Sequence, residues 1–238
     1  MILDIDAGNS RVKWRLSGPE GGGIRRGECG NGEWQLSGMV ADHCSLERVR
    51  IANVRGPEFE SSMCEQLRSL CGITPEFAQS SAFCAGVTSG YEEPESLGVD
   101  RWLAILAAYN DCNDGCCVVD AGTAITFDVI AQNGKHAGGF IVPGLQAQRR
   151  NLMDSTRIRL AGMPDWSGVG VGRSTFSAVH GGVASMVLDW IVNESKGKGI
   201  VYLTGGDASV LSNLLQRCGV RYCVVPDLVL DGLAFALP

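Results

Sequence analysis

The chain has 238 residues, with 20 basic and 26 acidic side chains and a formal net charge of −6. A chain of this length can bury a substantial hydrophobic core, in one large α/β domain or in two smaller lobes. Its acidic balance, without a continuous basic stripe, argues against nucleic acid as a partner. A hydrophobic content of 45% with 19% charged residues excludes a disordered or fibrous protein.

The N-terminal segment and the apolar runs predict a cytoplasmic protein with no membrane partner. Asp4 and Asp6 lie where a signal peptide would carry basic residues followed by an apolar run. The apolar run at residues 102–109 is shorter than the roughly 18 residues that a membrane span needs. The ten cysteines have no CxxC or zinc-ribbon spacing, so we expect most of them to be reduced, buried side chains.

An internal repeat divides the chain into two halves. Residues 2–9 (ILDIDAGN) are echoed by residues 117–123 (CVVDAGT), and the two Asp-Ala-Gly turns begin 120 − 6 = 114 residues apart. A second β-rich run follows each turn, at residues 12–16 and 125–130, so each copy predicts a β-hairpin. Two such hairpins predict a duplicated α/β protein whose turns face each other across a cleft.

The remaining patterns predict alternating strands and helices. In chain order they are a strand at 48–54, a helix at 58–70, a short β stretch at 77–78, a helix at 99–110, a strand at 138–144, helices at 145–154 and 174–194, a strand at 200–203 and a helix that begins at Ala208. We expect Asp207 to cap this last helix. The turn signal Asn113-Asp114-Gly115 places the boundary after residue 111, which gives lobes 1–111 and 112–238.

The turns of both hairpins have the composition of a phosphate-binding site. Gly8 allows a tight turn that directs backbone N–H groups toward one point, and Asn9 and Ser10 add hydrogen-bonding side chains. Asp6 supplies a carboxylate oxygen that can hold Mg²⁺ directly or through water. Residues 120–123 repeat this pattern, and the pairing favours phosphate binding over two ordinary Asp-x-Gly turns.

Two further segments can contribute to such a site. The strand that ends at Thr204 leads through Gly205 and Gly206 into a helix N-terminus, which is a natural contact for a nucleotide. Asp100 lies in the first turn of a predicted helix, where its carboxylate can accept a hydroxyl proton or can simply stabilise the helix dipole. Arg101, next to it, can bind a substrate carboxylate through paired hydrogen bonds.

Other nucleotide-binding and hydrolase motifs are absent from the sequence. No GxxxxGK[ST] motif occurs, and the glycines of residues 168–172 lack the strand-to-helix setting of a dinucleotide fingerprint. None of the three histidines lies beside a GxSxG nucleophile elbow, and we interpret His180 as a packed helix residue.

Four segments in this order resemble the signature motifs of type III pantothenate kinases. They are residues 6–14 (DAGNSRVKW), 98–102 (GVDRW), 120–124 (DAGTA) and 138–144 (GGFIVPG). Residues 174–178 and 203–206 resemble the family's later substrate segment and its adenosine-side turn, so the resemblance spans nearly the whole chain. It implies an α/β fold of two duplicated ribonuclease H-like lobes with an ATP cleft between them, as in actin-like ATPases and sugar kinases.

The same resemblance implies ATP-dependent phosphorylation of pantothenate to 4′-phosphopantothenate, the first step of coenzyme A biosynthesis. It implies a homodimer that uses ATP with Mg²⁺ and a monovalent cation, K⁺ or NH₄⁺. Asp100 would be the general base and Asp120 the ligand of the monovalent cation. The implied ATP contacts are Asp6, Ala7, Gly8, Asn9, Ser10, Arg11, Val12, Lys13 and Thr123. The implied pantothenate contacts are Tyr91, Gly98, Val99, Asp100, Arg101 and Thr175.

The chain departs from the family pattern at two positions. Ser10 stands where the family more often has Thr, and Ser89 stands where it often has Asn, two residues before Tyr91. Two alternative functions share the implied fold: a non-catalytic, nucleotide-binding accessory factor for transcription, and another kinase or phosphatase of the same superfamily. The presence of all three acids, Asp6, Asp100 and Asp120, favours an enzyme.

Overall fold

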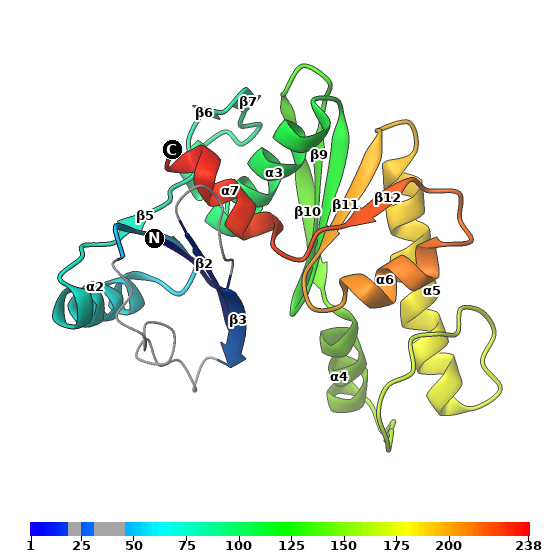
Figure 1. The fold of residues 1–238 in the computed structure, drawn as a ribbon. Coiled ribbons are helices and arrows are strands. Elements are labelled where there is room, and N and C mark those ends of the chain that lie inside the picture. Colours follow the sequence, from blue (N-terminus) through cyan, green and yellow to red (C-terminus); the bar gives the residue numbers. More distant parts are fainter. Residues whose placement is uncertain (19–24, 31–45) are drawn as a thin grey trace. The chain divides into compact units, whose positions relative to one another are not determined.

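The computed structural model describes residues 1–18, 25–30 and 46–238, which form two compact units (Figure 1). The first unit comprises Met1–Ala107 together with Asp227–Pro238, and the second comprises Ala108–Pro226. The predicted boundary after residue 111 lies 111 − 107 = 4 residues from this division. The predicted lobes differ from the observed units in the last segment, because residues 227–238 pack in the first unit.

The two units have similar inventories of secondary structure. The first contains β1 (Ile2–Ala7), β2 (Arg11–Ser17), β3 (Arg25–Gly30), β4 (Arg48–Asn53), α2 (Pro57–Cys71), β5 (Glu76–Phe77), β6 (Phe83–Cys84), β7 (Val87–Thr88), the 3-10 helix η2 (Pro94–Ser96), most of α3 (Val99–Cys112) and α7 (Leu228–Ala236). The second contains β8 (Cys116–Ala121), β9 (Ala124–Ile130), β10 (His136–Pro143), α4 (Leu145–Ser155), α5 (Thr175–Ser195), β11 (Ile200–Thr204), α6 (Ala208–Leu215) and β12 (Tyr222–Val224).

Each unit is built on a five-stranded sheet with one shared topology. The strand orders are β3-β2-β1-β4-β5 and β10-β9-β8-β11-β12. In each sheet the first three strands are antiparallel, and the last two run parallel to the central strand, β1 or β8. The predicted hairpins and the predicted duplicated α/β fold are therefore confirmed.

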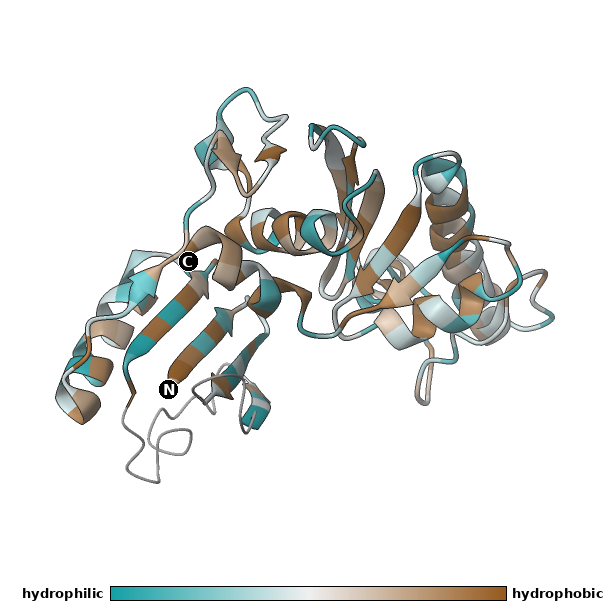
Figure 2. Ribbon diagram, turned by 45° about the horizontal axis from the view of Figure 1, so that its top comes forward, coloured by the Kyte–Doolittle hydropathy of each residue, from teal (hydrophilic) through white to brown (hydrophobic). Residues whose placement is uncertain are grey.

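The core of the first unit lies between its sheet and α2. Hydrophobic and hydrophilic residues alternate along its strands (Figure 2), because successive side chains point to opposite faces. The buried core residues are Leu3, Ile5, Val12, Leu16, Val49, Ile51, Met63 and Leu67. Pro57 starts α2 at its first turn, and Gly72 ends it with a left-handed φ of 69°. The predicted strand at 48–54 and helix at 58–70 correspond to β4 and α2.

The opposite face of the first sheet carries a buried network of ion pairs. Asp4 is 1% exposed and accepts hydrogen bonds from Arg50 at 2.8 and 3.1 Å and from Arg15 at 3.2 Å. Arg15 also pairs with Asp231 of α7. These contacts hold residues 227–238 on the first sheet, which explains why the last segment belongs to the first unit.

Helix α5 supplies several core residues of the second unit. Within the described ranges it is the one helix whose length and composition would allow it to span a membrane. Its residues Val183, Ala184, Val187 and Ile191 are buried in the core against the sheet, so packing accounts for its apolar composition. His180 is 1% exposed, and its Nδ1 is 2.8 Å from the carbonyl oxygen of Phe176, which confirms its prediction as a packed helix residue.

Some sequence predictions differ from the structure. Strand β3, the β6–β7 hairpin, β12 and α7 were not predicted. Asp207 stands at the N-cap of α6, as predicted, but its side chain makes no capping hydrogen bond to the helix. Among the described cysteines, Cys116 and Cys117 are buried and seven others are partly exposed, so the prediction that most are buried is wrong.

The buried network makes Asp4 a sensitive position for stability. The substitution Asp4→Ala leaves Arg50 and Arg15 without their shared counter-charge, and we expect it to lower the free energy of unfolding by about 3–5 kcal/mol. The matched substitution Glu47→Ala removes an exposed carboxylate that is 3.0 Å from the N-terminal amine, and we expect a change within about 0.5 kcal/mol. Urea denaturation of both variants measures the difference, and equal losses would contradict a special role of the network.

Candidate active site

The turn between β1 and β2 carries part of the predicted phosphate site. Asp6 and Lys13 lie directly opposite each other in the strand register, so their side chains share one face of the sheet. Asn9 and Ser10 are exposed at the tip. The turn is tight at Gly8, where a Cβ atom would lie 3.2 Å from the next strand's first carbonyl oxygen. The arrangement presents an acid, a base and two small polar side chains at one end of the hairpin.

The other residues of this segment point elsewhere. The side chains of Ala7 and Val12 are fully buried toward the core of the unit, so only their backbone groups are available to a ligand. Arg11 is exposed on β2, and its guanidinium donates to Glu28 of β3 at 2.7 Å. The predicted phosphate segment is therefore a mixture of turn residues and residues that support the hairpin.

A second cluster in the first unit lies at the N-terminus of α3. The backbone N–H of Arg101 donates to Asp100 Oδ1 at 2.8 Å, which fixes the orientation of this carboxylate. A Cβ atom at Gly98 would lie 2.7 Å from the same oxygen, so the position before the helix has no room for a side chain unless Asp100 moves. Leu97 is held by its carbonyl oxygen, which accepts from Ser80 Oγ at 2.7 Å.

Tyr91 and Arg101 are brought together in this cluster. Arg101 is 6% exposed, and its Nη1 donates to the Tyr91 hydroxyl at 2.6 Å. The guanidinium carbon also lies 5.5 Å from the centroid of the Tyr91 ring, within the range of a cation–π contact. Ser89 Oγ accepts from the Tyr91 N–H at 3.3 Å, so the serine that departs from the family pattern still braces this loop.

Three turns meet in the second unit around Asp120. Thr204 at the end of β11 lies opposite Asp120 in the parallel register. The backbone N–H of Asp207 donates to the Ala121 carbonyl at 2.8 Å, and that of Gly144 donates to the Thr123 carbonyl at 2.9 Å. The turns after β8, β10 and β11 are thus fastened to one another by backbone hydrogen bonds.

Two glycines make this convergence possible. A Cβ atom at Gly144 would lie 2.1 Å from the Gly122 carbonyl oxygen. A Cβ atom at Gly205 would lie 2.3 Å from Asp120 Oδ1, and Gly205 also has a left-handed φ of 89°. The sequence indicated a glycine turn at Gly205 and Gly206, but the contacts of Gly144 and Gly205 with the 120–123 turn were not predicted. The signal was the recurrence of a glycine directly after each strand.

Thr175, the remaining predicted substrate residue, is the first residue of α5. Ser174 and Ser177 form a capping box before it, with reciprocal backbone-to-hydroxyl distances of 3.1 Å. Thr175 lines a groove of about 910 Å³ between α4 and α5, whose walls include Leu152 and Val179. The structure therefore places Thr175 in the second unit, and Tyr91, Gly98, Val99, Asp100 and Arg101 in the first.

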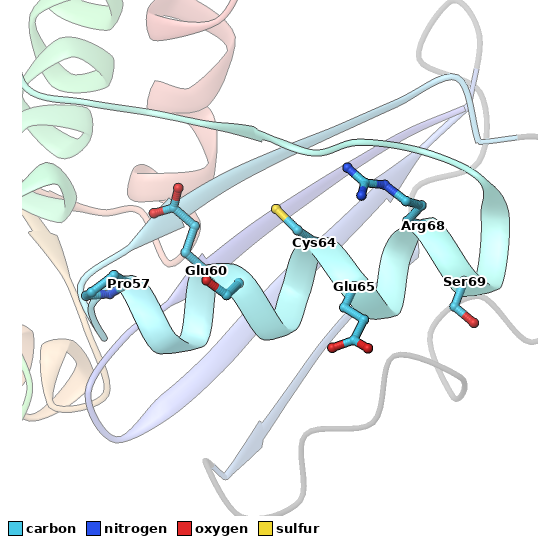
Figure 3. A pocket seen from close by; sticks show the side chains of 7 residues that line it. Pro57, Glu60, Cys64, Glu65, Arg68 and Ser69 are labelled. Atoms are coloured by element: carbon cyan, nitrogen blue, oxygen red, sulfur yellow. The ribbon is translucent and has the colours of Figure 1, made fainter.

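A hollow of about 650 Å³ also runs along α2 (Figure 3). Its described lining residues all belong to one side of that helix: Pro57, Glu60, Ser61, Cys64, Glu65, Arg68 and Ser69. It contains none of the predicted site residues. Across the described ranges, no group of three or more His, Cys, Asp or Glu side chains could hold a metal ion.

Solved structures show which fold the chain shares. One of them is a conserved putative Baf family transcriptional activator from Campylobacter jejuni. The match covers 98% of this chain and 95% of that chain, with a TM-score of 0.60 and 22% identity. The chain also matches a putative 2-dehydro-3-deoxygalactonokinase from Sinorhizobium meliloti over 98% and 95% of the two chains, with a TM-score of 0.59 and 14% identity. The fold is that of the sugar kinases and actin-like ATPases, as predicted.

Sequence comparisons identify the family within that class. The model of type III pantothenate kinases matches residues 2–194. The type III pantothenate kinase of Ectopseudomonas mendocina is 35% identical over 100% of this chain and 99% of the relative. That of Chromohalobacter salexigens is 37% identical over 100% of this chain and 88% of the relative. The chain belongs to the type III pantothenate kinase family.

The Gly205 contact gives a test with a control in the next residue. The substitution Gly205→Ala puts a Cβ on Asp120 and on the Ala121 carbonyl at a left-handed φ, and we expect it to lower the free energy of unfolding by at least about 2 kcal/mol. No described atom lies within 4 Å of a Cβ at Gly206, so Gly206→Ala is expected to change stability by less than about 0.5 kcal/mol. Thermal unfolding of the pair checks this, and equal melting temperatures would show that the turn can relax.

Proposed function

We propose that this chain transfers the γ-phosphoryl group of ATP to the primary hydroxyl of pantothenate. The product is 4′-phosphopantothenate, and the reaction is the first step of coenzyme A biosynthesis. The observation that carries this function is the family match, which runs through full-length relatives named as type III pantothenate kinases. The chain is an enzyme of the kinase class, and ATP with a divalent metal is the phosphoryl donor expected of that class.

The hairpin turns are proposed to hold the triphosphate. In the first unit the backbone N–H groups from Asp6 to Val12 and the side chains of Asn9, Ser10 and Lys13 would bind phosphate oxygens, and in the second unit Thr123 would do so. Phosphoryl transfer is catalysed mainly by such positioning and by neutralising charge. Asp6 fits a Mg²⁺ site, because Mg²⁺ in kinases is held by one or two carboxylates together with water and substrate phosphates. The ion would neutralise phosphate charge.

The cluster at the start of α3 is proposed to hold pantothenate. Asp100 takes the proton of the attacking hydroxyl as the general base, in the orientation that the Arg101 N–H fixes. The guanidinium of Arg101, already positioned by Tyr91, binds the pantothenate carboxylate. Gly98 and Val99 supply the backbone beside it, and Thr175 is the remaining proposed contact of pantothenate.

Asp120 is proposed to bind the monovalent cation. Its carboxylate lies where Gly205 and the turn at 120–123 bring backbone carbonyl oxygens close together, and oxygen atoms are the ligands that such a hard cation takes. We also propose that the enzyme is a cytoplasmic homodimer without nucleic-acid or membrane partners. The accessory-factor alternative is not favoured, because the transcriptional activator from Campylobacter jejuni is similar at 22% identity only and shows the fold alone.

The general base can be tested by the isosteric substitution Asp100→Asn. We expect kcat to fall by about 10²- to 10⁴-fold, the usual contribution of general base catalysis, while ATP binding changes less than about twofold. Glu95→Gln, an exposed acid of the preceding 3-10 helix, is the control and should keep wild-type turnover. Steady-state kinetics with pantothenate gives kcat, and calorimetry gives nucleotide affinity. Wild-type kcat in the Asp100 variant would remove this carboxylate from the mechanism.

The cation site can be tested by product analysis. Purified protein with pantothenate and Mg-ATP should form phosphopantothenate, detected by mass spectrometry, in K⁺ or NH₄⁺ but not in Na⁺ alone. Asp120→Asn should raise the K⁺ concentration needed for half-maximal rate, because it removes the charge that offsets the ion. Product formation that is equal in all three salts would refute the cation site without refuting the kinase. Nucleotide binding without product in any salt would favour the accessory factor.

A further inference from the structure

Arg55 is a partly exposed arginine with one buried nitrogen atom, and no role described above uses it. It follows the last residue of β4 by two positions, and its Nη1 atom is buried with no hydrogen-bond partner in the described structure. Its Cζ atom lies 4.1 Å from the centroid of the Phe59 ring on α2. A buried, charged N–H group without an acceptor lowers the stability of the folded state. Arg50, on β4 itself, is instead paired with Asp4. Because the Arg55 side chain is partly exposed, a ligand can supply acceptors to its guanidinium.

The position of Arg55 points to the ligand. Strands β1 and β4 are parallel, with Ala7 opposite Asn53, and the Val54 N–H donates to the Ala7 carbonyl at 3.3 Å. Two residues beyond this pair the chain reaches Asn9 on one side and Arg55 on the other. Because the carboxyl ends of parallel strands meet at one edge of a sheet, Arg55 leaves β4 at the edge that carries the first phosphate turn.

The local structure fixes Arg55 before any ligand binds. Asn53 Oδ1 accepts from the Arg55 N–H at 2.9 Å, and Asn53 Nδ2 donates to the Gly56 carbonyl at 3.0 Å. Gly56 has a φ of 88°, a conformation that favours glycine, and Pro57 then begins α2. The backbone is braced on both sides of Arg55, and stacking on Phe59 restricts the guanidinium. Such a preorganised group binds an anion with little loss of conformational entropy.

We infer that Arg55 binds the polyphosphate of the nucleotide and positions it at the turn between β1 and β2. This inference rests on the proposed kinase function. A guanidinium presents a planar set of N–H donors that matches two phosphate oxygens at once, and the phosphates of ATP or ADP are the anions that the neighbouring turn would hold. In the proposed function, Arg101, which Tyr91 positions, would bind the carboxylate of pantothenate, the other substrate.

The test separates charge from packing. Arg55→Met keeps an unbranched chain on Phe59 but removes the N–H donors, and Arg55→Lys keeps the charge without the planar fork. Arg68→Met, which changes an exposed arginine of α2 (Figure 3), is the matched control. For each variant we would measure the affinity for ADP and for inorganic pyrophosphate by calorimetry, KM for both substrates, and the melting temperature.

Arg55→Met should weaken ADP and pyrophosphate binding and raise KM for ATP by about 10- to 100-fold, the loss expected for a charge-assisted hydrogen bond. KM for pantothenate and the melting temperature should match those of Arg68→Met. The ADP affinity and the KM for ATP of Arg55→Lys should lie between those of Arg55→Met and those of the wild type. Unchanged ADP affinity in a folded Arg55→Met protein would overturn the inference, as would a rise confined to the KM for pantothenate. If Arg55→Met does not fold, unchanged ADP affinity in Arg55→Lys overturns it.

The binding measurements keep this test separate from the proposed function. If the wild-type protein formed no phosphopantothenate, the kinase proposal would fail, but the comparison of ADP affinities would still decide the role of Arg55. If the wild type were active and the Arg55 variants bound ADP normally, the kinase proposal would stand and the inference about Arg55 would be wrong.

Discussion

The central strand of each sheet pairs antiparallel with one neighbour and parallel with the other, and the site in each unit depends on this arrangement. The antiparallel partner follows directly through a turn, so Asp6 and Asp120 are each carried to the tip of a hairpin. The parallel partner ends at the same edge, so Asn53 and Thr204 arrive beside those tips. Because the pleat points alternate residues to opposite faces, Asp6 shares the face of Asp4 and Lys13, while its neighbours Ile5 and Ala7 fill the core.

Burial divides the charged residues of the first sheet into two groups with different duties. Asp4 pairs with both Arg15 and Arg50, and Arg15 attaches the last helix through Asp231. Asp6 and Lys13 lie two residues closer to the turn on the same strands, β1 and β2. If the strands paired with a register shifted by one residue, core side chains would lie on the face that now carries the ion pairs. The strand register therefore determines both the stability of the sheet and the placement of the candidate ligands.

Local patterns were sufficient to predict the elements with strong periodicity. The two hairpins, α2, α3 and α5 were predicted from residues that are close in sequence, and so was the position of Asp100 at the start of a helix. Strand β3 was not predicted, because its sequence, RRGECG, has few residues with high strand propensity. Helix α7 depends on the pairing of Arg15 with Asp231, 216 residues away, which no local pattern encodes. The same holds for Arg55, whose unpaired nitrogen is visible only once Phe59 has been packed beside it.

The return of residues 227–238 to the first unit also makes that unit discontinuous in sequence. The second unit is one continuous segment, Ala108–Pro226, whereas the first is complete only when residues 227–238 pack on it. Asp231 of this segment is the partner of Arg15, 216 residues away. Forming the first unit therefore closes a long loop that contains the whole second unit, and it bears an entropic cost of loop closure that the second unit does not have.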